Sequence, residues 1–342
     1  MKRGRPILLG IVGDSAAGKS TLTKGILDII GRERVTHVCL DDYHKYDRVE
    51  RARLGITALH PDCNYIDVME QHLEQLHYGS PILKPVYDHA AGALVRPEYV
   101  VPREFVLIDG LLAFSTPTLR DFIDVKVFLD PPETLRREWK IKRDTTKRGY
   151  TVAQVEEELV KREHDSRQFI SPQREFADIV VRFYPPSPSD RMAPSDSLNA
   201  RLVLRPTIPH PDLTYLVEET HHGDRGIRLE LGRDAGRPVD FLEIDDNVSN
   251  RQSRELENAI WRHLPDLARV EAGQLGSYQD RGVECHSDQL ALTQLLLTYH
   301  LLRKFGDVTE LRFAPPVGAM RRMKVVGAND AGPRAAIARP YR

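Results

Sequence analysis

Residues 13–21 read Gly13-Asp14-Ser15-Ala16-Ala17-Gly18-Lys19-Ser20-Thr21. This stretch has the G-x-x-x-x-G-K-S spacing of a phosphate-binding loop, and it lies between the apolar run Ile7–Val12 and a segment of helical periodicity. In such a loop, backbone N–H groups and the start of the following helix face phosphate oxygens. We therefore predict that these nine residues bind ATP, with Lys19 beside the β and γ phosphates and Ser20 as a Mg²⁺ ligand.

A second acidic position is expected near this loop, because bound Mg²⁺ needs a further oxygen ligand or an acceptor for its water. The apolar run Phe105–Ile108 ends in Asp109 and Gly110. We expect Asp109 to take the metal-linked role, the alternative being an ordinary turn acid before a glycine.

Five short apolar runs alternate with segments of helical periodicity in the first half of the chain. They are Ile7–Val12, Val35–Leu40, Phe105–Ile108, Val125–Leu129 and Ile179–Phe183. Runs rich in Val, Ile and Leu are typical of parallel strands covered on both faces. The pattern predicts an α/β fold, a three-layer P-loop kinase-like sandwich around a mainly parallel sheet.

The composition changes after this core, which we place at residues 1–185. Residues 186–198 are rich in Pro, Ser, Asp and Asn and predict a linker or loop. Over residues 199–318, alternating polar and apolar residues, as in Ile227–Leu231, predict an antiparallel extension of strands and helices. The remaining residues, 319–342, lack periodicity and predict a mobile tail.

One late segment, Leu290–Leu302, is strongly apolar but includes Thr293, Gln294, Thr298 and His300. It is shorter than the roughly 20 residues of a membrane span, so we interpret it as a core helix.

The overall composition excludes several classes of protein. Among the 342 residues, 49 basic side chains balance 50 acidic ones, which argues against a nucleic-acid binder that works through bulk charge. Three scattered cysteines are too few for a disulfide framework or a structural zinc site, and they favour a reducing compartment. Because Gly10 interrupts the first apolar run and no cleavage site follows, we expect no signal peptide and a cytoplasmic protein.

The second predicted strand ends in Leu40-Asp41-Asp42-Tyr43-His44. Ligands of open parallel sheets bind at the carboxyl ends of strands, so Asp41 is a candidate general base for an attacking hydroxyl. The alternative is an acidic loop that caps a helix.

A charged stripe follows the fourth predicted strand. Lys140, Arg143, Asp144 and Lys147 share one helix face, and the helix ends at Arg148-Gly149. The stripe is either a solvated face or a lid that closes cations over the transferring phosphates, and beside a phosphate loop we favour the lid.

The aperiodic stretch Lys84–His89 lies between a helix and the strand of Asp109. Together with His44 and Arg48, it could form a basic pocket suited to an anionic acceptor.

These segments together resemble phosphoribulokinase of the plant and cyanobacterial type, in the phosphoribulokinase/uridine kinase family. Besides the phosphate loop, the resemblance rests on CLDDYH (39–44), TALHP (57–61), NYIDVMEQ (64–71), KPVYDHAAG (84–92), WKIKRDTTKRG (139–149) and FISPQREFAD (169–178). Their order and spacing match from Ile7 to about Pro185, and the resemblance is thinner beyond.

The resemblance implies a homodimer that phosphorylates the C1 hydroxyl of D-ribulose 5-phosphate with ATP, for carbon fixation in the Calvin cycle. It implies that Asp41 is the catalytic base, that Lys140 and Arg143 act on the transferring phosphates, and that Asp144 supports them. The residues expected to hold the sugar phosphate are His44, Arg48, Tyr87, His89 and Arg148.

Two departures from that family matter. Regulated members have a cysteine in the phosphate loop that pairs with the one at position 39, whereas this loop has none. Redox control through that disulfide is therefore not expected. The other departure is Asp109, which stands where the family usually has Glu.

Two other functions stay open. A uridine-kinase-like enzyme would share the loop and Asp41, but its uncharged acceptor leaves the basic acceptor segments and the C-terminal extension unexplained. A non-catalytic ATP-binding regulator would need neither Asp41 nor Asp144.

Overall fold

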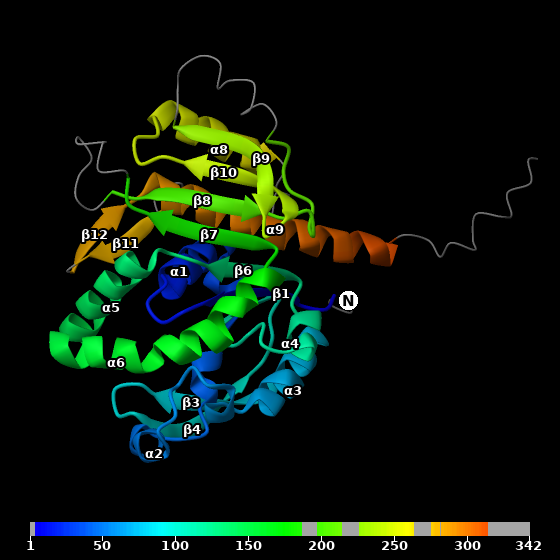
Figure 1. The fold of residues 1–342 in the computed structure, drawn as a ribbon. Coiled ribbons are helices and arrows are strands. Elements are labelled where there is room, and N and C mark those ends of the chain that lie inside the picture. Colours follow the sequence, from blue (N-terminus) through cyan, green and yellow to red (C-terminus); the bar gives the residue numbers. More distant parts are fainter. Residues whose placement is uncertain (1–3, 187–196, 214–225, 263–274, 281, 314–342) are drawn as a thin grey trace, which may run out of the picture.

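A single eight-stranded sheet forms the centre of the protein (Figure 1). The structure is a computed structural model, and it describes residues 4–186, 197–213, 226–262, 275–280 and 282–313. The strand order is β2-β5-β1-β6-β7-β8-β10-β9. These strands are β1 (Ile7–Gly13), β2 (Val35–Cys39), β5 (Phe105–Gly110), β6 (Val125–Leu129), β7 (Ile179–Tyr184), β8 (Asn199–Leu204), β9 (Ile227–Asp234) and β10 (Arg237–Ile244).

The first five strands of this order are parallel, as predicted. Beyond β7 the sheet continues with β8, β10 and β9, which are all antiparallel to their neighbours. The C-terminal strands therefore extend the same sheet that carries the phosphate-binding loop. Most of the predicted linker over 186–198 and all of the predicted tail over 319–342 lie outside the described residues, so the division into domains stays a prediction.

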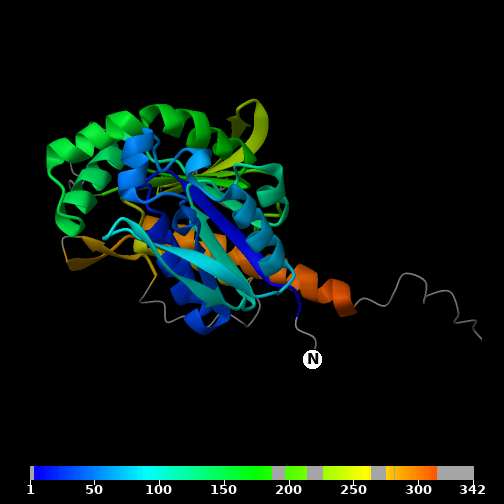
Figure 2. The ribbon, with the colours of Figure 1, turned by 90° about the horizontal axis from the view of Figure 1, so that it is seen from below.

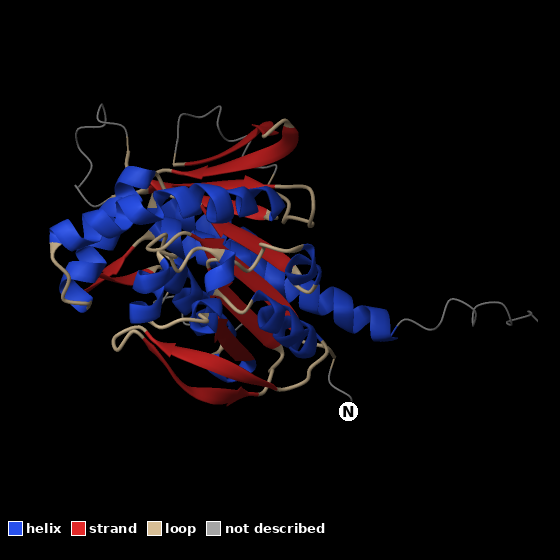
Figure 3. Cartoon of the chain, turned by 60° about the horizontal axis from the view of Figure 1, so that its bottom comes forward, coloured by secondary structure: helices blue, strands red, loops and turns tan. Residues whose placement is uncertain are grey.

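Helices cover both faces of the sheet and make the predicted three layers (Figure 3). Along β1, Ile7, Leu9 and Ile11 face one core and Leu8 and Val12 face the other, because side chains alternate along a strand. The first core includes residues of α1 (Lys19–Ile30), α8 (Asn250–Arg262) and α9 (Asp288–Phe313). The second includes residues of α3 (Ile66–His77) and α4 (Pro117–Asp121).

Two further helices, α5 (Glu133–Lys147) and α6 (Val152–Asp165), pack against each other after β6. Helix α6 continues into η4 (Ser166–Ile170), a turn of π-helix, and then into η5 (Ser171–Phe176). Among the described residues, no helix combines the length and the apolar composition that crossing a membrane requires.

The prediction of an aperiodic stretch over Lys84–His89 is wrong, because most of it lies in β3 (Ile82–Asp88). This strand pairs with β4 (Ala93–Val100) in a separate hairpin. Pro85 and an irregularity between Lys84 and Val86 break the alternation that would identify a strand.

The helix α2 (Arg48–Leu54) and the strands β11 (Ser277–Asp280) and β12 (Val283–His286) are among the other elements that the sequence pattern does not predict. Helix α2 has no buried residue and so no apolar periodicity, although Asp47 and Glu50 form a capping box at its start. Strands β11 and β12 form a short hairpin.

Candidate active site

The phosphate-binding loop connects β1 to α1, as predicted. Its turn uses positive φ angles at Ala16 (68°) and Gly18 (99°). The Lys19 ammonium donates hydrogen bonds to the carbonyl oxygens of Gly13 (2.7 Å) and Asp14 (3.2 Å). Since these bonds hold the lysine over the loop, its charge lies where bound phosphates would be.

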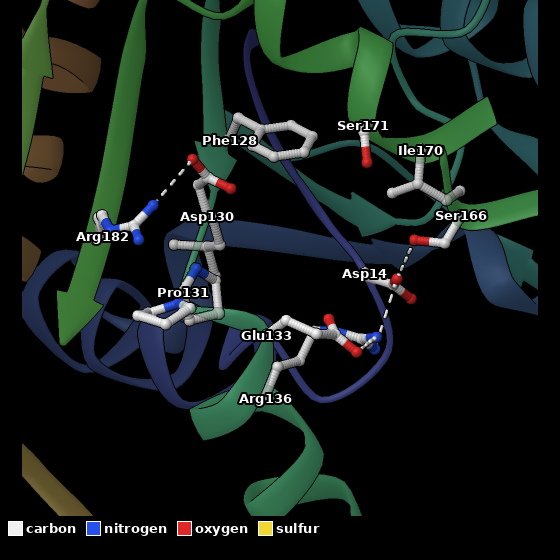
Figure 4. A pocket seen from close by; sticks show the side chains of 12 residues that line it. Asp14, Phe128, Asp130, Pro131, Glu133, Arg136, Ser166, Ile170, Ser171 and Arg182 are labelled. Carbon is white, nitrogen blue, oxygen red and sulfur yellow. Dashed lines mark hydrogen bonds and ion pairs between the residues drawn. The ribbon is translucent and has the colours of Figure 1, made fainter. Parts of the chain in front are cut away.

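Helix α5 and η4 hold the loop through Asp14. The Asp14 carboxylate accepts a hydrogen bond from the Ser166 hydroxyl and lies 3.4 Å from a guanidinium nitrogen of Arg136 (Figure 4). Arg136, which is buried, also donates to the carbonyl oxygen of Ser15 at 3.1 Å. The sequence pattern did not identify Arg136 or Ser166, which lie just before the segments 139–149 and 169–178 that it singled out.

A cavity of about 220 Å³ opens beside the loop, near the carboxyl ends of β6 and β7 (Figure 4). Phe128 and Ile170 contribute apolar surface to it, and Asp14 and Arg136 border it on the loop side. Another lining carboxylate, Asp130, lies 3.7 Å from Arg182. The cavity thus combines a few apolar side chains with a mostly polar lining next to the phosphate-binding loop.

The carboxylate of Asp109 lies at the end of β5, between β1 and β2 in the sheet. Its Oδ1 atom is 3.2 Å from Nε2 of His37. Burial alone would raise the pKa of Asp109, but the hydrogen bond with His37 and the nearby Lys19 ammonium lower it below its ordinary value. Asp109 is therefore an ionised, buried carboxylate within electrostatic reach of the loop lysine.

Ser20 and Asp109 offer a hydroxyl and a carboxylate, and this oxygen-only donor set suits Mg²⁺. Among the described residues, no group of three or more His, Cys, Asp or Glu forms a metal site made of protein ligands alone. Such a pair of ligands suits a metal that is mainly held by nucleotide phosphates.

Asp41 lies in the short helix η2 (Leu40–Tyr43), directly after β2. Its Oδ1 atom accepts a hydrogen bond from the backbone N–H of Leu111 at 3.1 Å. A Cβ atom at Gly110 would lie 2.8 Å from Cβ of Leu40, so glycine is needed for this close approach. The end of β5 thus orients the Asp41 carboxylate, and no side chain caps η2.

The neighbouring carboxylate, Asp42, forms an ion pair with the buried Lys84 and accepts the backbone N–H of Tyr87 at 3.2 Å. These bonds fasten β3 to η2. Lys84, which the sequence suggests for the acceptor pocket, is therefore engaged by Asp42.

Three rings gather beside Asp41. The ring centroids of His44 and Tyr87 are 4.9 Å apart, and those of Tyr87 and His89 are 5.1 Å apart. The Nδ1 atom of His44 lies 2.7 Å from Oδ1 of Asn64. Burial lowers the pKa of His44 to about 4 in spite of the Asp41 charge, so this imidazole is neutral at pH 7.

Helix α2 brings two arginines to the same place. Arg48 donates to the carbonyl oxygen of His89 at 2.7 Å. Arg51, one turn further along the helix, donates to the Tyr87 hydroxyl at 2.8 Å, and its guanidinium lies 5.0 Å from the centre of that ring. Arg51 was missed by the sequence analysis; its spacing of three residues from Arg48 on a capped helix is the signal that could have found it.

The charged stripe of α5 is only partly solvated. Lys140, Arg143 and Arg148 converge on Asp144, at 2.8, 2.8 and 3.4 Å from its carboxylate oxygens. Lys140 and Asp144 are buried, while Lys147 is exposed and lies outside this cluster. Burial alone would raise the pKa of Asp144, but the hydrogen bonds from Arg143 and Lys140 lower it to about 2.

The stripe and the loop meet, since Arg143 donates to the Ser15 hydroxyl at 3.3 Å. Burial lowers the pKa of His89; the charge of Asp41 opposes this shift and the charge of Arg148 adds to it. Both groups are therefore close to the His89 ring. The structure therefore brings the loop, the acids after β2 and β5, the β3 aromatics and the α5 cations together at one end of the parallel sheet. This arrangement can bind a nucleoside triphosphate opposite an anionic acceptor.

Comparisons with known proteins point in the same direction. The model of the phosphoribulokinase/uridine kinase family matches residues 8–187. A phosphoribulokinase from Synechocystis sp. is 35% identical over 260 residues, which cover 72% of this chain and 78% of that protein. A chloroplastic phosphoribulokinase from Mesembryanthemum crystallinum is 30% identical, with 62% of this chain and 58% of that protein covered.

A uridine kinase from Chloroflexus aurantiacus is 32% identical over 181 residues, which cover 51% of this chain and 86% of that protein. Among solved structures, a phosphoribulokinase from Rhodobacter spheroides aligns with a TM-score of 0.53 and 18% identity, covering 71% of this chain and 91% of that one. This likeness supports the fold.

Proposed function

The chain belongs to the phosphoribulokinase/uridine kinase family, and from this premise we propose that it transfers the γ-phosphoryl group of ATP to the C1 hydroxyl of D-ribulose 5-phosphate. The products are ribulose 1,5-bisphosphate and ADP, for the Calvin cycle. The observation that carries the proposal is the basic cluster opposite the loop, where Arg48, Arg51 and the ring of Tyr87 lie beside Asp41 and His89.

In the proposed mechanism, Asp41 accepts the proton of the attacking hydroxyl, held in place by the N–H of Leu111. Lys19, Lys140 and Arg143 stabilise the negative charge on the transferring phosphoryl group. Ser20 and Asp109 would hold Mg²⁺, which supplies charge neutralisation at the phosphates when bound. The cavity beside the loop would take the nucleoside end of ATP.

The acceptor residues favour a phosphorylated sugar over a nucleoside. Arginine forks match phosphate oxygens with two parallel hydrogen bonds, and uridine offers no such anion. The neutral imidazole of His44 and the hydroxyl of Tyr87 would bind the hydroxyl groups of the sugar.

The experiment that tests this proposal is an ADP-release assay of the purified protein with Mg-ATP and either ribulose 5-phosphate or uridine. We expect turnover with ribulose 5-phosphate and none above background with uridine. Turnover with uridine alone would make the chain a nucleoside kinase, and no turnover with either would support a non-catalytic ATP-binding regulator.

Replacing Arg51 with lysine should raise KM for ribulose 5-phosphate by about tenfold, because a charge-assisted, two-pronged hydrogen bond contributes about 1.5 kcal/mol. KM for ATP should stay the same, since Arg51 contacts the acceptor side. Steady-state kinetics with each substrate varied in turn measure both values. The matched control is Arg53→Lys, an exposed arginine on the same helix, and an equal effect of the two substitutions would contradict the role of Arg51.

We also propose that the protein is a cytoplasmic homodimer. Its three cysteines are free thiols, which suits a reducing compartment. Strand β9 is the last strand of the sheet, and Leu231 on it is 80% exposed. This edge offers a second copy a strand to pair with.

A further inference from the structure

Gln294 is a polar residue in the apolar middle of α9 and is fully buried. Its amide nitrogen donates to the carbonyl oxygen of Thr21 at 3.2 Å, and its amide oxygen accepts the backbone N–H of Gly276 at 3.0 Å. The side chain therefore joins the first turn of α1 to a segment just before β11. Helices α1 and α9 pack against each other over one face of the sheet, and α9 then runs on beyond it (Figure 2).

Gly25 makes room for this side chain. A Cβ atom at Gly25 would lie between 2.0 and 2.3 Å from the amide group of Gln294. Real Cβ atoms do not come this close to other heavy atoms, so a side chain at Gly25 would displace the Gln294 amide from the position that it occupies here. Because Gly25 lies one turn after Thr21, the missing side chain also opens the path to the Thr21 carbonyl.

Burying an amide is unfavourable unless both of its ends are hydrogen-bonded. Leucines before and after Gln294 pack in the same core without that requirement. The amide at this position therefore depends on its two hydrogen bonds, which hold particular backbone atoms. One of these atoms belongs to the helix turn that starts with Lys19 and Ser20.

We propose that Gln294 is a positioning residue for nucleotide binding, through which the C-terminal half fixes the phosphate-binding end of α1. This inference rests on the proposed role of the loop as the ATP site. It gives the C-terminal extension a part in nucleotide affinity, although none of its described residues lines the cavity beside the loop.

The first test replaces Gln294 with methionine, which keeps the volume and removes both hydrogen bonds. We expect about fivefold weaker ADP binding and a matching rise in KM for ATP, with KM for the acceptor unchanged. The fluorescence of Trp139 reports binding, because its indole lies next to the phosphate-binding loop. A Cβ atom built on Gly18 would be 3.9 Å from this ring. The only other tryptophan, Trp261, is first replaced by phenylalanine in every variant.

The matched control is Gln289→Met. Gln289 is also buried in α9, but its amide nitrogen donates to the carbonyl oxygen of Asp245, away from α1. We expect this variant to lose stability and to keep its ADP affinity. Equal losses of ADP affinity in the two variants would overturn the proposal.

The second test separates positioning from packing with Gly25→Ala, Gln294→Ala and the double variant. We expect Gly25→Ala to lower Tm because of the clash, and the double variant to regain Tm because the removed side chain leaves room. The double variant should keep the weakened ADP binding, since the bond to Thr21 stays absent. Recovery of ADP affinity together with Tm would show that the pair only packs, and would overturn the proposal.

These outcomes differ from failure of the proposed function. A parent protein that does not bind ADP or ATP would contradict the ATP site itself. A parent that binds ADP, with Gln294→Met binding it equally well, would contradict only the role of Gln294.

Discussion

Replacing Asp41 with asparagine is expected to lower kcat by about 10²- to 10⁴-fold, the usual contribution of a positioned general base. The amide keeps the shape of the side chain and can still accept the N–H of Leu111, so the local fold should persist. It cannot take up the proton of the attacking hydroxyl. Stopped-time ADP release measures kcat, and the fluorescence of Trp139 measures nucleotide binding.

The specific expectation is that nucleotide affinity stays unchanged in this variant. Asp62→Asn is the matched control, because Asp62 is a carboxylate whose side chain is 84% exposed. It should behave as the unaltered protein does. Loss of ADP binding in proportion to turnover in Asp41→Asn would contradict the assignment of Asp41 as the base.

The second large effect is expected for Asp144→Asn, which removes the anion on which Lys140, Arg143 and Arg148 converge. Removing one partner of a buried ion pair typically costs about 3–5 kcal/mol, because the other charge stays buried without compensation. We expect a loss of stability of that order. We also expect kcat to fall by about 10²-fold or more, as the cations separate from the transferring phosphates.

The pH dependence of stability gives this prediction a second measurement. Because the pKa of Asp144 falls from 3.8 to about 2 on folding, its stabilising effect is complete above pH 4 and is lost as pH falls towards 2. Urea unfolding between pH 2 and pH 6 should therefore show a smaller acid-side loss in Asp144→Asn. The control is Glu157→Gln on α6, an exposed partner of Lys161, which should leave the acid-side loss of stability unchanged.

An equal response of these two variants to pH would contradict the proposed role of Asp144. So would a normal kcat in Asp144→Asn.

The parallel half of the sheet could be predicted from the sequence because its strands are buried on both faces. Continuous apolar runs such as Phe105–Ile108 leave little room for another interpretation. The phosphate-binding loop could be predicted because its glycines and lysine lie at fixed spacing between a strand and a helix.

The acceptor side could be predicted only in part, because its residues lie on exposed or irregular elements. Helix α2 has no buried face and β3 contains Pro85, so neither shows the periodicity that locates an element. Arg51 was missed for this reason. Gln294 was visible as a polar residue in an apolar helix, but its contact with Thr21 spans 273 positions and depends on the tertiary fold.

The packing of α1 against α9 also affects the order in which the chain can fold during its synthesis. Helix α1 ends at Ile30, whereas its partner α9 begins only at Asp288, much later along the chain. Until α9 is synthesised, the apolar side of α1 lacks the cover that α9 gives it. The nascent kinase core is therefore expected to stay incompletely packed until α9 has been synthesised.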